Sequence, residues 1–433
     1  MLKSLKIANV GPSLEASMHF SERLNIFTGD NGLGKSFILD IVWWALTRRW
    51  PAEVNPKLAS GFMASPARQG DASIKFEIKV KTKPFQYTSK FDRKAQAWIG
   101  RVGRPGNPGL VLYAQADGSF AVWDPARNYW RQQHNLDIQE RIPAFVFTSS
   151  EVWEGLRDEN AKLLCNGLIS DWAGWQKEKG EAFQVLCSVL GALSPGDEEA
   201  MVPGSLTRIS LDDPRDIPTL RMSYGIDVPL PKVSAGMRRI ISMAYMLVWA
   251  WNEHYQASIL LDQPTTDQVT FLIDEIEAHL HPKWQRRIVK ALLNVTGKIS
   301  RWPDVQLIAT THSPMVMASL EQLFDPKKDS WFDLDYSESS EGSNQEVIIT
   351  KRTFIKKGDA SDWLISEAFD LDYPTSIEAE SVLKEASKLL SSEEEIDKAT
   401  AKKLDQDLRT VLGETDPFWI RWSYIAEKKG WLS

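Results

Sequence analysis

The chain has 433 residues, 43% of them hydrophobic and 25% charged, so it is long enough to bury a full core in one large or two moderate domains. A formal net charge of −7 excludes a chain-wide basic coat for nucleic acid, because phosphate binding draws on clustered Lys and Arg, and leaves room only for a local basic groove. No run approaches the roughly 18 apolar residues of a membrane span and the first residues lack the apolar core of a signal peptide, so we expect a cytoplasmic protein outside the membrane.

The chain opens with predicted strands at residues 2–9 and 24–28 and an amphipathic helix at residues 35–49. Residues 29–36, before this helix, read GDNGLGKS and match the phosphate-loop pattern G-x-x-x-x-G-K-[ST]. Glycines let backbone N–H groups surround phosphates, and the helix start adds positive potential. Lys35 is expected to reach the β and γ phosphates and Ser36 to bind Mg²⁺. The predicted nucleotide-binding residues in this loop are Gly29, Asp30, Asn31, Gly32, Leu33, Gly34, Lys35, Ser36 and Phe37.

Short strands separated by Gly, Pro and Asn turns are predicted between residues 72 and 130, which favours an antiparallel subdomain. A further strand at residues 142–147 leads into apolar helices over residues 150–193. Cys165 and Cys187 lie in these helices, so we expect small buried side chains rather than a disulfide or a metal pair.

A second anion-binding pattern precedes the long apolar helix predicted at residues 237–251. Residues 233–239 read VSAGMRR, and Ser234 and Gly236 would present a hydroxyl and free N–H groups at the helix start. A plain helix cap has the same composition, so both readings stay open at this point.

Two carboxylates end the apolar strand predicted at residues 269–273. Asp274 is expected to hold Mg²⁺ and Glu275 to polarise the attacking water. A rival stretch, LLDQPT at residues 260–265, has Asp262 followed by Gln in place of the glutamate. We prefer Asp274 because its strand is longer, and because an Asp-Gln-Pro-Thr stretch is also an ordinary turn.

A helix predicted at residues 283–295 and a strand at residues 305–310 lead to the sequence THSP. His312 in this sequence follows the carboxyl end of a sheet strand, where open α/β folds bind ligands. We therefore expect His312 to contact the γ-phosphate or the attacking water. Two more strands and a charged helical tail from residue 359 to residue 433 complete the chain.

In this order, GDNGLGKS, VSAGMRR, FLIDEIEAHLHP and ATTHSP resemble the ABC-type ATPase heads of the SMC, RecF and OLD-like group, and most of all the compact AAA-family ATPases of bacterial anti-phage defence operons. The resemblance covers about residues 1–320. It implies an α/β fold: an ABC-ATPase-like P-loop NTPase head with an antiparallel β subdomain, a helical lobe and a C-terminal helical extension. The expected parts are 1–150 and 231–325 for the head, 151–230 for the lobe, and 326–433 for an extension that docks a partner.

The resemblance also implies ATP and Mg²⁺ as cofactors and a homodimer or higher homo-oligomer. Ser234 and Gly236 of one copy would face the phosphates held by Lys35 and Ser36 of the other. Glu275 matches the hydrolytic glutamate and His312 the switch histidine, while residues 277–282 match the segment that meets the partner head. A glutamine often stands at the strand-to-lobe junction of the family, but here the junction at residues 147–151 reads FTSSE, which leaves the last Mg²⁺ ligand open.

Several residues allow other functions. His279 and His281 leave two interpretations open: a pair of metal ligands, or a part of the dimer interface. The pairs Asp333/Asp335 and Asp370/Asp372 imitate a Toprim nuclease, although turn or strand acids explain them more simply. Three basic pairs fit either a DNA groove or solvated helix faces; they are Arg48/Arg49, Arg238/Arg239 and Arg286/Arg287.

These features favour an ATPase that dimerises around ATP and regulates a separately encoded effector, a nuclease, in anti-phage defence. The alternatives are a RecF-like repair ATPase that acts directly on DNA and an ATP-gated scaffold with little turnover. The expected partners are therefore a second copy and an operon-encoded effector, with DNA as a further candidate.

Overall fold

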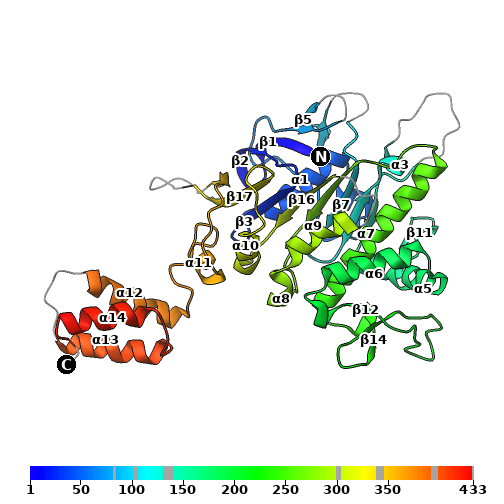
Figure 1. The fold of residues 1–433 in the computed structure, drawn as a ribbon. Coiled ribbons are helices and arrows are strands. Elements are labelled where there is room, and N and C mark those ends of the chain that lie inside the picture. The colour runs from blue at the N-terminus through cyan, green and yellow to red at the C-terminus, as the bar shows by residue number, and fades with distance from the viewer. Residues whose placement is uncertain are drawn as a thin grey trace. The chain divides into compact units, whose positions relative to one another are not determined.

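The chain folds as two compact units, Met1–Gly358 and Asp359–Ser433. The computed structural model describes residues 1–80, 84–100, 106–129, 141–298, 304–337, 346–391 and 398–431. Figure 1 labels the elements in chain order. Among the described residues, no helix is both long enough and apolar enough to cross a membrane, and this includes the 26-residue α7 (Ala235–Leu260).

An eight-stranded sheet forms the centre of the first unit. Its five middle strands are parallel to one another. At one edge a single further strand pairs antiparallel with its neighbour, and at the other edge two further strands each pair antiparallel with the strand before them. In spatial order the strands are β18 (Val347–Arg352), β17 (Asp329–Tyr336), β3 (Leu24–Gly29), β16 (Asp304–Thr310), β15 (Gln268–Ile273), β7 (Leu110–Ala114), β8 (Phe120–Trp123) and β9 (Phe145–Phe147). Parallel neighbours end at the same edge, so the loops after β3, β16, β15 and β7 come together there.

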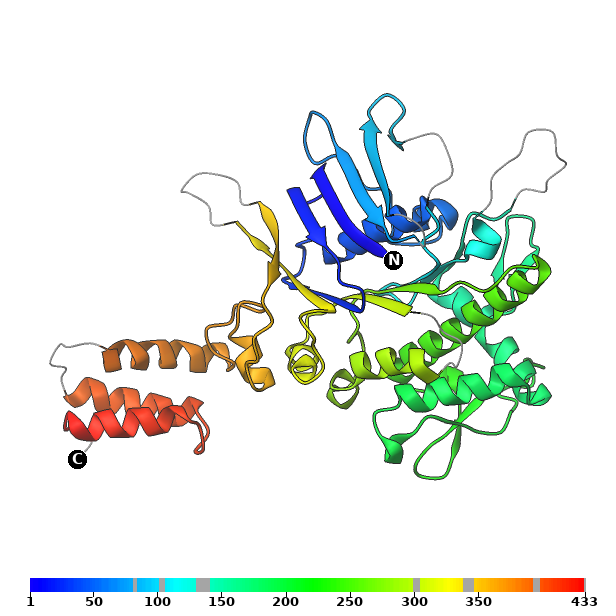
Figure 2. The same ribbon diagram turned by 45° about the horizontal axis from the view of Figure 1, so that its top comes forward.

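A second, antiparallel sheet has five strands, seen in blue in Figure 2. In spatial order they are β2 (Ser13–His19), β1 (Leu2–Val10), β4 (Ser73–Ile78), β5 (Phe85–Asp92) and β6 (Ala97–Ile99). Exposed and buried residues alternate along β4 and β5, the pattern of a sheet with one face in water. This sheet is the antiparallel subdomain that the sequence predicts.

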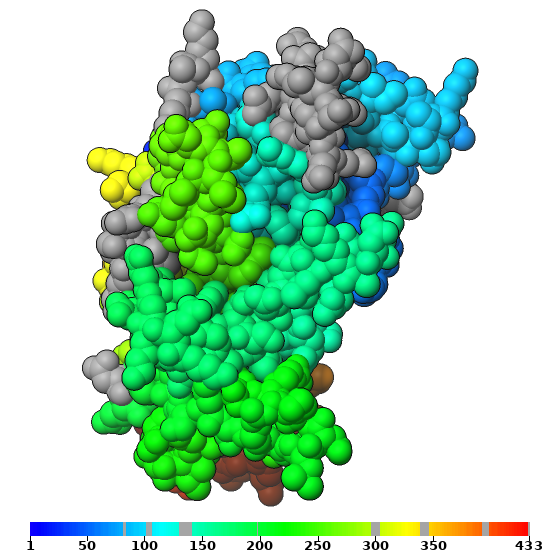
Figure 3. Space-filling view, turned by 90° about the vertical axis from the view of Figure 1, so that its right-hand side faces the viewer, coloured from blue at the N-terminus to red at the C-terminus, as the bar shows by residue number. Residues whose placement is uncertain are grey.

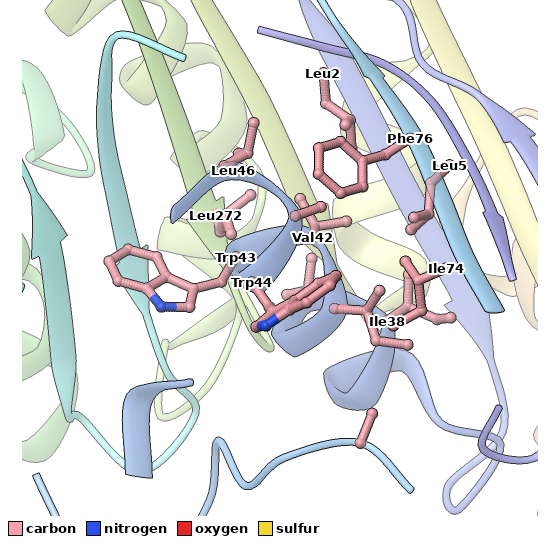
Figure 4. Packing of buried hydrophobic residues seen from close by; sticks show 14 of the residues in the cluster. Leu2, Leu5, Ile38, Val42, Trp43, Trp44, Leu46, Ile74, Phe76 and Leu272 are labelled. Carbon is pink, nitrogen blue, oxygen red and sulfur yellow. The ribbon is translucent and has the colours of Figure 1, made fainter. Parts of the chain in front are cut away.

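Helix α1 (Lys35–Thr47) lies between the two sheets and is buried on nearly all sides. Its apolar residues meet Ile74 and Phe76 of the antiparallel sheet and Leu272 of the central sheet (Figure 4). A helix that is apolar all round is expected to be buried in this way. Each such side chain contributes on the order of 1.5–3 kcal/mol on burial, so the core fixes the helix that starts at the phosphate loop.

The helical lobe follows β9 and is coloured green in Figures 1 and 3. It contains α4 (Ser149–Glu154), α5 (Leu168–Glu178), α6 (Glu181–Leu193) and α7, with α6 packed against α7 and α9 (Ile288–Lys298). Two small sheets, β10 (Leu156–Arg157) with β11 (Leu163–Cys165) and β12 (Val202–Pro203), β13 (Thr219–Arg221) and β14 (Asp227–Pro229), belong to it. The remaining short helices of the unit are α2 (Pro51–Val54), α3 (Pro125–Asn128), α8 (Pro282–Gln285) and α10 (Pro314–Leu320), with 3-10 turns at Asp197–Glu199 and Leu230–Lys232.

The second unit is helical and has its own apolar core, which includes Leu383, Leu404 and Trp422. Its helices are α11 (Ala360–Leu364), α12 (Ile377–Ser391), α13 (Lys398–Val411) and α14 (Phe418–Lys428). The predicted fold class is confirmed: an α/β P-loop head with an antiparallel subdomain, a helical lobe and C-terminal helices. Because β17 and β18 join the central sheet, the helical part of the extension begins after them, while the four-part domain division stays a prediction.

Candidate functional site

The loop between β3 and α1 has a backbone that requires glycine. Gly29, Gly32 and Gly34 have φ values of 127°, 84° and 95°, which other residues rarely adopt. A Cβ on Gly29 would lie 2.3 Å from the Leu334 carbonyl oxygen, and one on Gly34 would lie 2.6 Å from Pro12. No side chain caps the start of α1, so its first N–H groups are available to an anion.

The ammonium of Lys35 lies inside this loop. The Lys35 side chain is buried, and its Nζ donates to the carbonyl oxygens of Gly29 at 2.7 Å and Asp30 at 2.8 Å. Burial lowers the pKa of Lys35 to about 8, against the opposing effect of Asp274 and other nearby carboxylates. A phosphate bound in the loop would therefore replace these two carbonyl groups as the hydrogen-bond partner of the Lys35 ammonium.

Some of the other loop residues are exposed to solvent, and others pack into the core. Asp30, Asn31, Gly32 and Ser36 are exposed, which leaves the Ser36 hydroxyl open at the helix start. Leu33 is buried in the core, and the ring of Phe37 lies against Gly11. Leu33 and Phe37 thus anchor the loop through packing, while their backbone belongs to the predicted phosphate site.

Asp274 and Glu275 follow β15 directly. Asp274 is buried, its N–H donates to the Ala114 carbonyl oxygen, and its Oδ1 accepts from the Thr310 hydroxyl at 2.8 Å. The Thr310 hydroxyl in turn accepts from the Glu275 N–H at 2.7 Å. Glu275 has φ of 46°, a conformation that costs on the order of 1–3 kcal/mol and that clusters at functional sites. Thr310 therefore holds a strained turn that carries both carboxylates.

His312 follows β16, the strand between β3 and β15. Its imidazole is half-buried, and burial together with the charge of Lys35 lowers the pKa of His312 below its ordinary value. The lowered pKa favours the neutral ring, which donates one hydrogen bond and accepts another. The structure thus brings the predicted Lys35, Asp274, Glu275 and His312 to one edge of the sheet.

Ser234 and Gly236 begin α7 in the helical lobe. The Ser234 hydroxyl accepts from the Met237 N–H at 3.4 Å, a long capping bond. Gly236 packs on the segment after β15, since a Cβ there would lie 2.6 Å from the His279 carbonyl oxygen. In the described part of the chain, neither residue has a hydrogen bond or ion pair to the phosphate loop, so their predicted role toward phosphates stays a prediction.

Gln115 is a candidate residue that the sequence interpretation missed. It follows β7, the parallel neighbour of β15, and is 2% exposed. Its amide oxygen has no hydrogen-bond partner among the described residues. Leaving a buried amide oxygen unpaired costs about 1–3 kcal/mol, which is expected where a ligand supplies the partner. The segment at residues 147–151, which contains no glutamine, follows β9 at the sheet edge, whereas Gln115 follows a strand that pairs with β15.

Arg239 connects the helical lobe to the same site. Its side chain is buried, and its guanidinium donates to the carbonyl oxygens of Gln115 and of Asp274, the latter at 3.1 Å. Arg48 is also largely enclosed, with its guanidinium 3.7 Å from the Trp44 ring centroid and 4.5 Å from that of Tyr87. A DNA groove that uses Arg48 and Arg239 is therefore wrong, because both cations already have internal partners.

The rival to Asp274 is also wrong. Asp262 is exposed, has φ of 50° and lies in a turn after α7 rather than at the end of a strand. His281 caps α8 by accepting from the Lys283 N–H, and no group of three or more metal-binding side chains gathers in the described part of the chain.

Of the two acid pairs that imitate a nuclease, Asp333/Asp335 has a buried member, while Asp372 of the other pair is 65% exposed in a surface ion pair. Asp333 is buried and accepts from the Thr28 hydroxyl at 2.7 Å and from Arg352 at 3.2 Å. Asp372 pairs with Lys384 at 2.5 Å. One carboxylate of each pair is thus occupied by structural contacts.

A buried carboxylate beneath the site gives a pH-dependent prediction. Asp40 on α1 is 9% exposed and accepts from the Tyr113 hydroxyl at 3.0 Å, and burial raises the pKa of Asp40 to about 7. A raised carboxyl pKa favours the folded state at low pH, and this stability is lost as the pH rises from about 4 to about 7. Asp40→Asn removes the titrating carboxylate and therefore this loss. Between pH 5 and pH 8 we expect the free energy of unfolding of the wild type to fall by on the order of 2 kcal/mol relative to that of Asp40→Asn.

Denaturant unfolding of both proteins at the two pH values measures this difference. Asp71→Asn, at an exposed position, is the matched control and should keep the wild-type pH dependence. An equal pH dependence in Asp40→Asn and the wild type would contradict the prediction.

Comparison with known proteins gives one family model and several relatives. Residues 24–318 match the model described as AAA domain, putative AbiEii toxin, Type IV TA system. The Septu protein PtuA of Bacillus thuringiensis is 20% identical over 339 residues, which is 74% of each chain. The retron Vc95 probable ATPase of Vibrio cholerae serotype O1 biovar El Tor is 43% identical over 60 residues, 14% of this chain and 10% of that protein. The retron Ec83 probable ATPase of Escherichia coli is 27% identical over 161 residues, 37% and 26% of the two chains.

Among solved structures, the SMC head domain from Thermotoga maritima is 14% identical and covers 81% of this chain and 99% of its own, with a TM-score of 0.39. The recombination mediator protein RecF-ATPrS is 11% identical and covers 82% and 98%, also with a TM-score of 0.39.

Proposed function

This chain belongs to the AAA-domain family described as putative AbiEii toxin, Type IV TA system, and from that membership we propose that it binds and hydrolyses ATP in a site completed by a second copy of itself. The observation that carries the proposal is the meeting of Lys35, Asp274, Glu275 and His312 at the carboxyl ends of adjacent parallel strands. This is the place where open α/β sheets bind ligands.

The residues present fit a magnesium ion. The Ser36 hydroxyl is exposed, Asp274 offers a carboxylate, and the Gln115 amide oxygen has no partner among the described residues. Oxygen donors of this kind suit Mg²⁺, which usually keeps several waters and binds through few protein ligands. When bound, the ion supplies positive charge to the β and γ phosphates.

The proposed roles of the other residues follow from their chemistry. Lys35 and the N–H groups of residues 29–36 hold the phosphates, as a buried cation and a free helix start together would do. Glu275 accepts the proton of the attacking water. His312, whose lowered pKa favours the neutral ring, donates a hydrogen bond to the γ-phosphate or orients that water.

Ser234 and Gly236 have no hydrogen bond or ion pair to the phosphate loop of their own chain within the described residues, which supports a proposed role toward the loop of a second copy. The free N–H groups at the start of α7 would contribute to the phosphates bound by the other copy. The proposed oligomer is a dimer with two such sites, or a larger assembly built from it.

We further infer a role in anti-phage defence through a separately encoded effector, a nuclease. Similarity to a Septu protein and to two retron ATPases supports this role. The second unit is the proposed docking site, since it has its own core and acidic residues outnumber basic ones in it. Ile420 and Tyr424, one turn apart on α14, are 79% and 67% exposed. An effector with a basic and apolar surface would fit these properties.

One observation favours direct DNA binding as a second candidate function. Lys6 and Lys75 are cross-strand neighbours on the exposed face of the antiparallel sheet, and Lys90 follows diagonally on β5. Like charges opposite each other destabilise a sheet, so a row of this kind suggests an anionic partner. Lys75 and Lys90 have no ion pair within the described ranges, whereas Lys6 pairs with Glu15.

The decisive experiment is to purify the chain with the products of its operon neighbours, and to measure stoichiometry and ATP turnover with and without duplex DNA. Co-purification of an effector and turnover in its complex are expected. Turnover that rises on duplex addition, with affinity falling steeply with salt, would favour the DNA function. ATP that is bound without turnover while the chain assembles would favour a scaffold.

A further inference from the structure

Glu277 lies in the segment after β15 but contacts the end of β16. Its Oε1 accepts from the His312 N–H at 2.5 Å, and its Oε2 accepts from the Thr311 hydroxyl at 2.7 Å. The carboxylate is half-buried, and both of its oxygens are used by these two donors. A single side chain thus fixes the backbone of the candidate switch histidine.

The segment that carries Glu277 is joined to β16 and to the helical lobe. The Ile276 N–H donates to the Thr310 carbonyl oxygen at 3.0 Å. Further along, Gln285 donates to the Leu280 carbonyl oxygen at 2.8 Å and accepts from the Ser313 hydroxyl at 2.7 Å. On the other side, the His279 carbonyl oxygen lies against Gly236 at the start of α7, with no room for a Cβ between them.

We propose that Glu277 is a positioning residue that couples the start of α7 to His312. A shift of α7 displaces the segment through the contact between Gly236 and His279. Glu277 passes this shift to His312 and Thr311 because its two hydrogen bonds allow little independent movement. The catalytic histidine is thereby placed correctly only when α7 is in its nucleotide-engaged position. This role rests on the proposed ATPase function, and it links the position of His312 to the engagement of α7 with nucleotide.

Glu277→Gln and Glu277→Ala test this role in the full-length chain. The glutamine side chain offers one acceptor oxygen and the alanine side chain offers none, so turnover should decrease from the wild type to Glu277→Gln and further to Glu277→Ala. We expect a decrease of at least about tenfold for Glu277→Gln, because small displacements of catalytic groups cost one to two orders of magnitude. ATP affinity and the dimer fraction with Mg-ATP should change by less than about threefold, since the hydrogen bonds of the Glu277 carboxylate go to Thr311 and His312 and not to the phosphate loop.

Two further measurements separate this role from a general loss of structure. Hydrogen exchange at the His312 amide should rise in Glu277→Ala, while exchange in β3 stays at the wild-type rate. Glu22→Gln, an exposed carboxylate on the antiparallel subdomain, is the matched control and should keep wild-type turnover and exchange.

The outcomes distinguish the two proposals. A wild-type protein without turnover contradicts the ATPase function, yet the exchange measurement still tests the contact. Wild-type turnover in both Glu277 variants overturns the positioning role. A loss of ATP affinity equal to the loss of turnover in Glu277→Gln also overturns it, because only a structural role would affect both alike.

Discussion

Glu275→Gln is expected to keep ATP bound and to accumulate the dimer, while turnover falls about 10²–10⁴-fold. Gln has nearly the same shape as Glu but cannot accept the proton of the attacking water. The strained turn that presents residue 275 is held by the Thr310 hydroxyl through a backbone N–H, so the substitution leaves it intact. Binding energy from the phosphates is therefore retained although the chemical step is blocked.

Light scattering with Mg-ATP measures the dimer, and single-turnover hydrolysis measures the chemical step. Glu154→Gln, an exposed side chain that pairs with Arg215, serves as the matched control. Hydrolysis at the wild-type rate in Glu275→Gln would show that another group takes the proton. Asp262 is excluded from that role by its place in an exposed turn. A variant that stays monomeric with Mg-ATP would contradict the composite site.

Lys35→Ala is expected to abolish nucleotide binding, with affinity reduced at least about 100-fold. Charge-assisted hydrogen bonds from an ammonium to phosphate contribute about 1.5–3 kcal/mol each, and a factor of ten in affinity corresponds to about 1.4 kcal/mol. The loss also leaves the Gly29 and Asp30 carbonyl oxygens without their donor, so the empty loop should be less ordered than in the wild type.

Titration with a fluorescent ATP analogue measures this affinity, and thermal unfolding checks the fold. Lys57→Ala is the matched control, because Lys57 is exposed and its ion pair is with Glu151 at the start of the helical lobe. Retention of wild-type affinity in Lys35→Ala would show that the loop does not bind phosphate.

The local structure around the candidate site residues follows from the sequence. The glycine spacing before Lys35, the two acids after an apolar strand and the histidine after another strand each depend on a few adjacent residues. Their strand and helix contexts were also predicted, because the hydrophobic pattern decides them locally. The biochemical roles of these residues stay predictions until the variants are measured.

The residues that were missed depend on which strands are neighbours. Gln115 follows an ordinary apolar strand, and only the pairing of β7 with β15 brings it beside Asp274. For Arg239 the sequence leaves a DNA groove and a solvated helix face open, and the fold instead brings its guanidinium to two strand ends inside the protein. Glu277 lies in the segment that is predicted to meet the partner head, and only the fold shows that its carboxylate accepts from the backbone after β16. Contacts between residues 35 or more positions apart leave no local pattern that a sequence interpretation can use.

The pairing of β17 with β3 has a mechanical consequence. Asp333 on β17 holds the hydroxyl of Thr28, the residue just before the phosphate loop, and Arg352 on β18 holds Asp333. The polypeptide continues from Arg352 to the second unit within a few residues. The backbone ladders of β17 with β18 and with β3 add to these side-chain bonds, so the last two strands of the first unit are tied to the start of the predicted phosphate loop, and a substitution that loosens them should also loosen that loop.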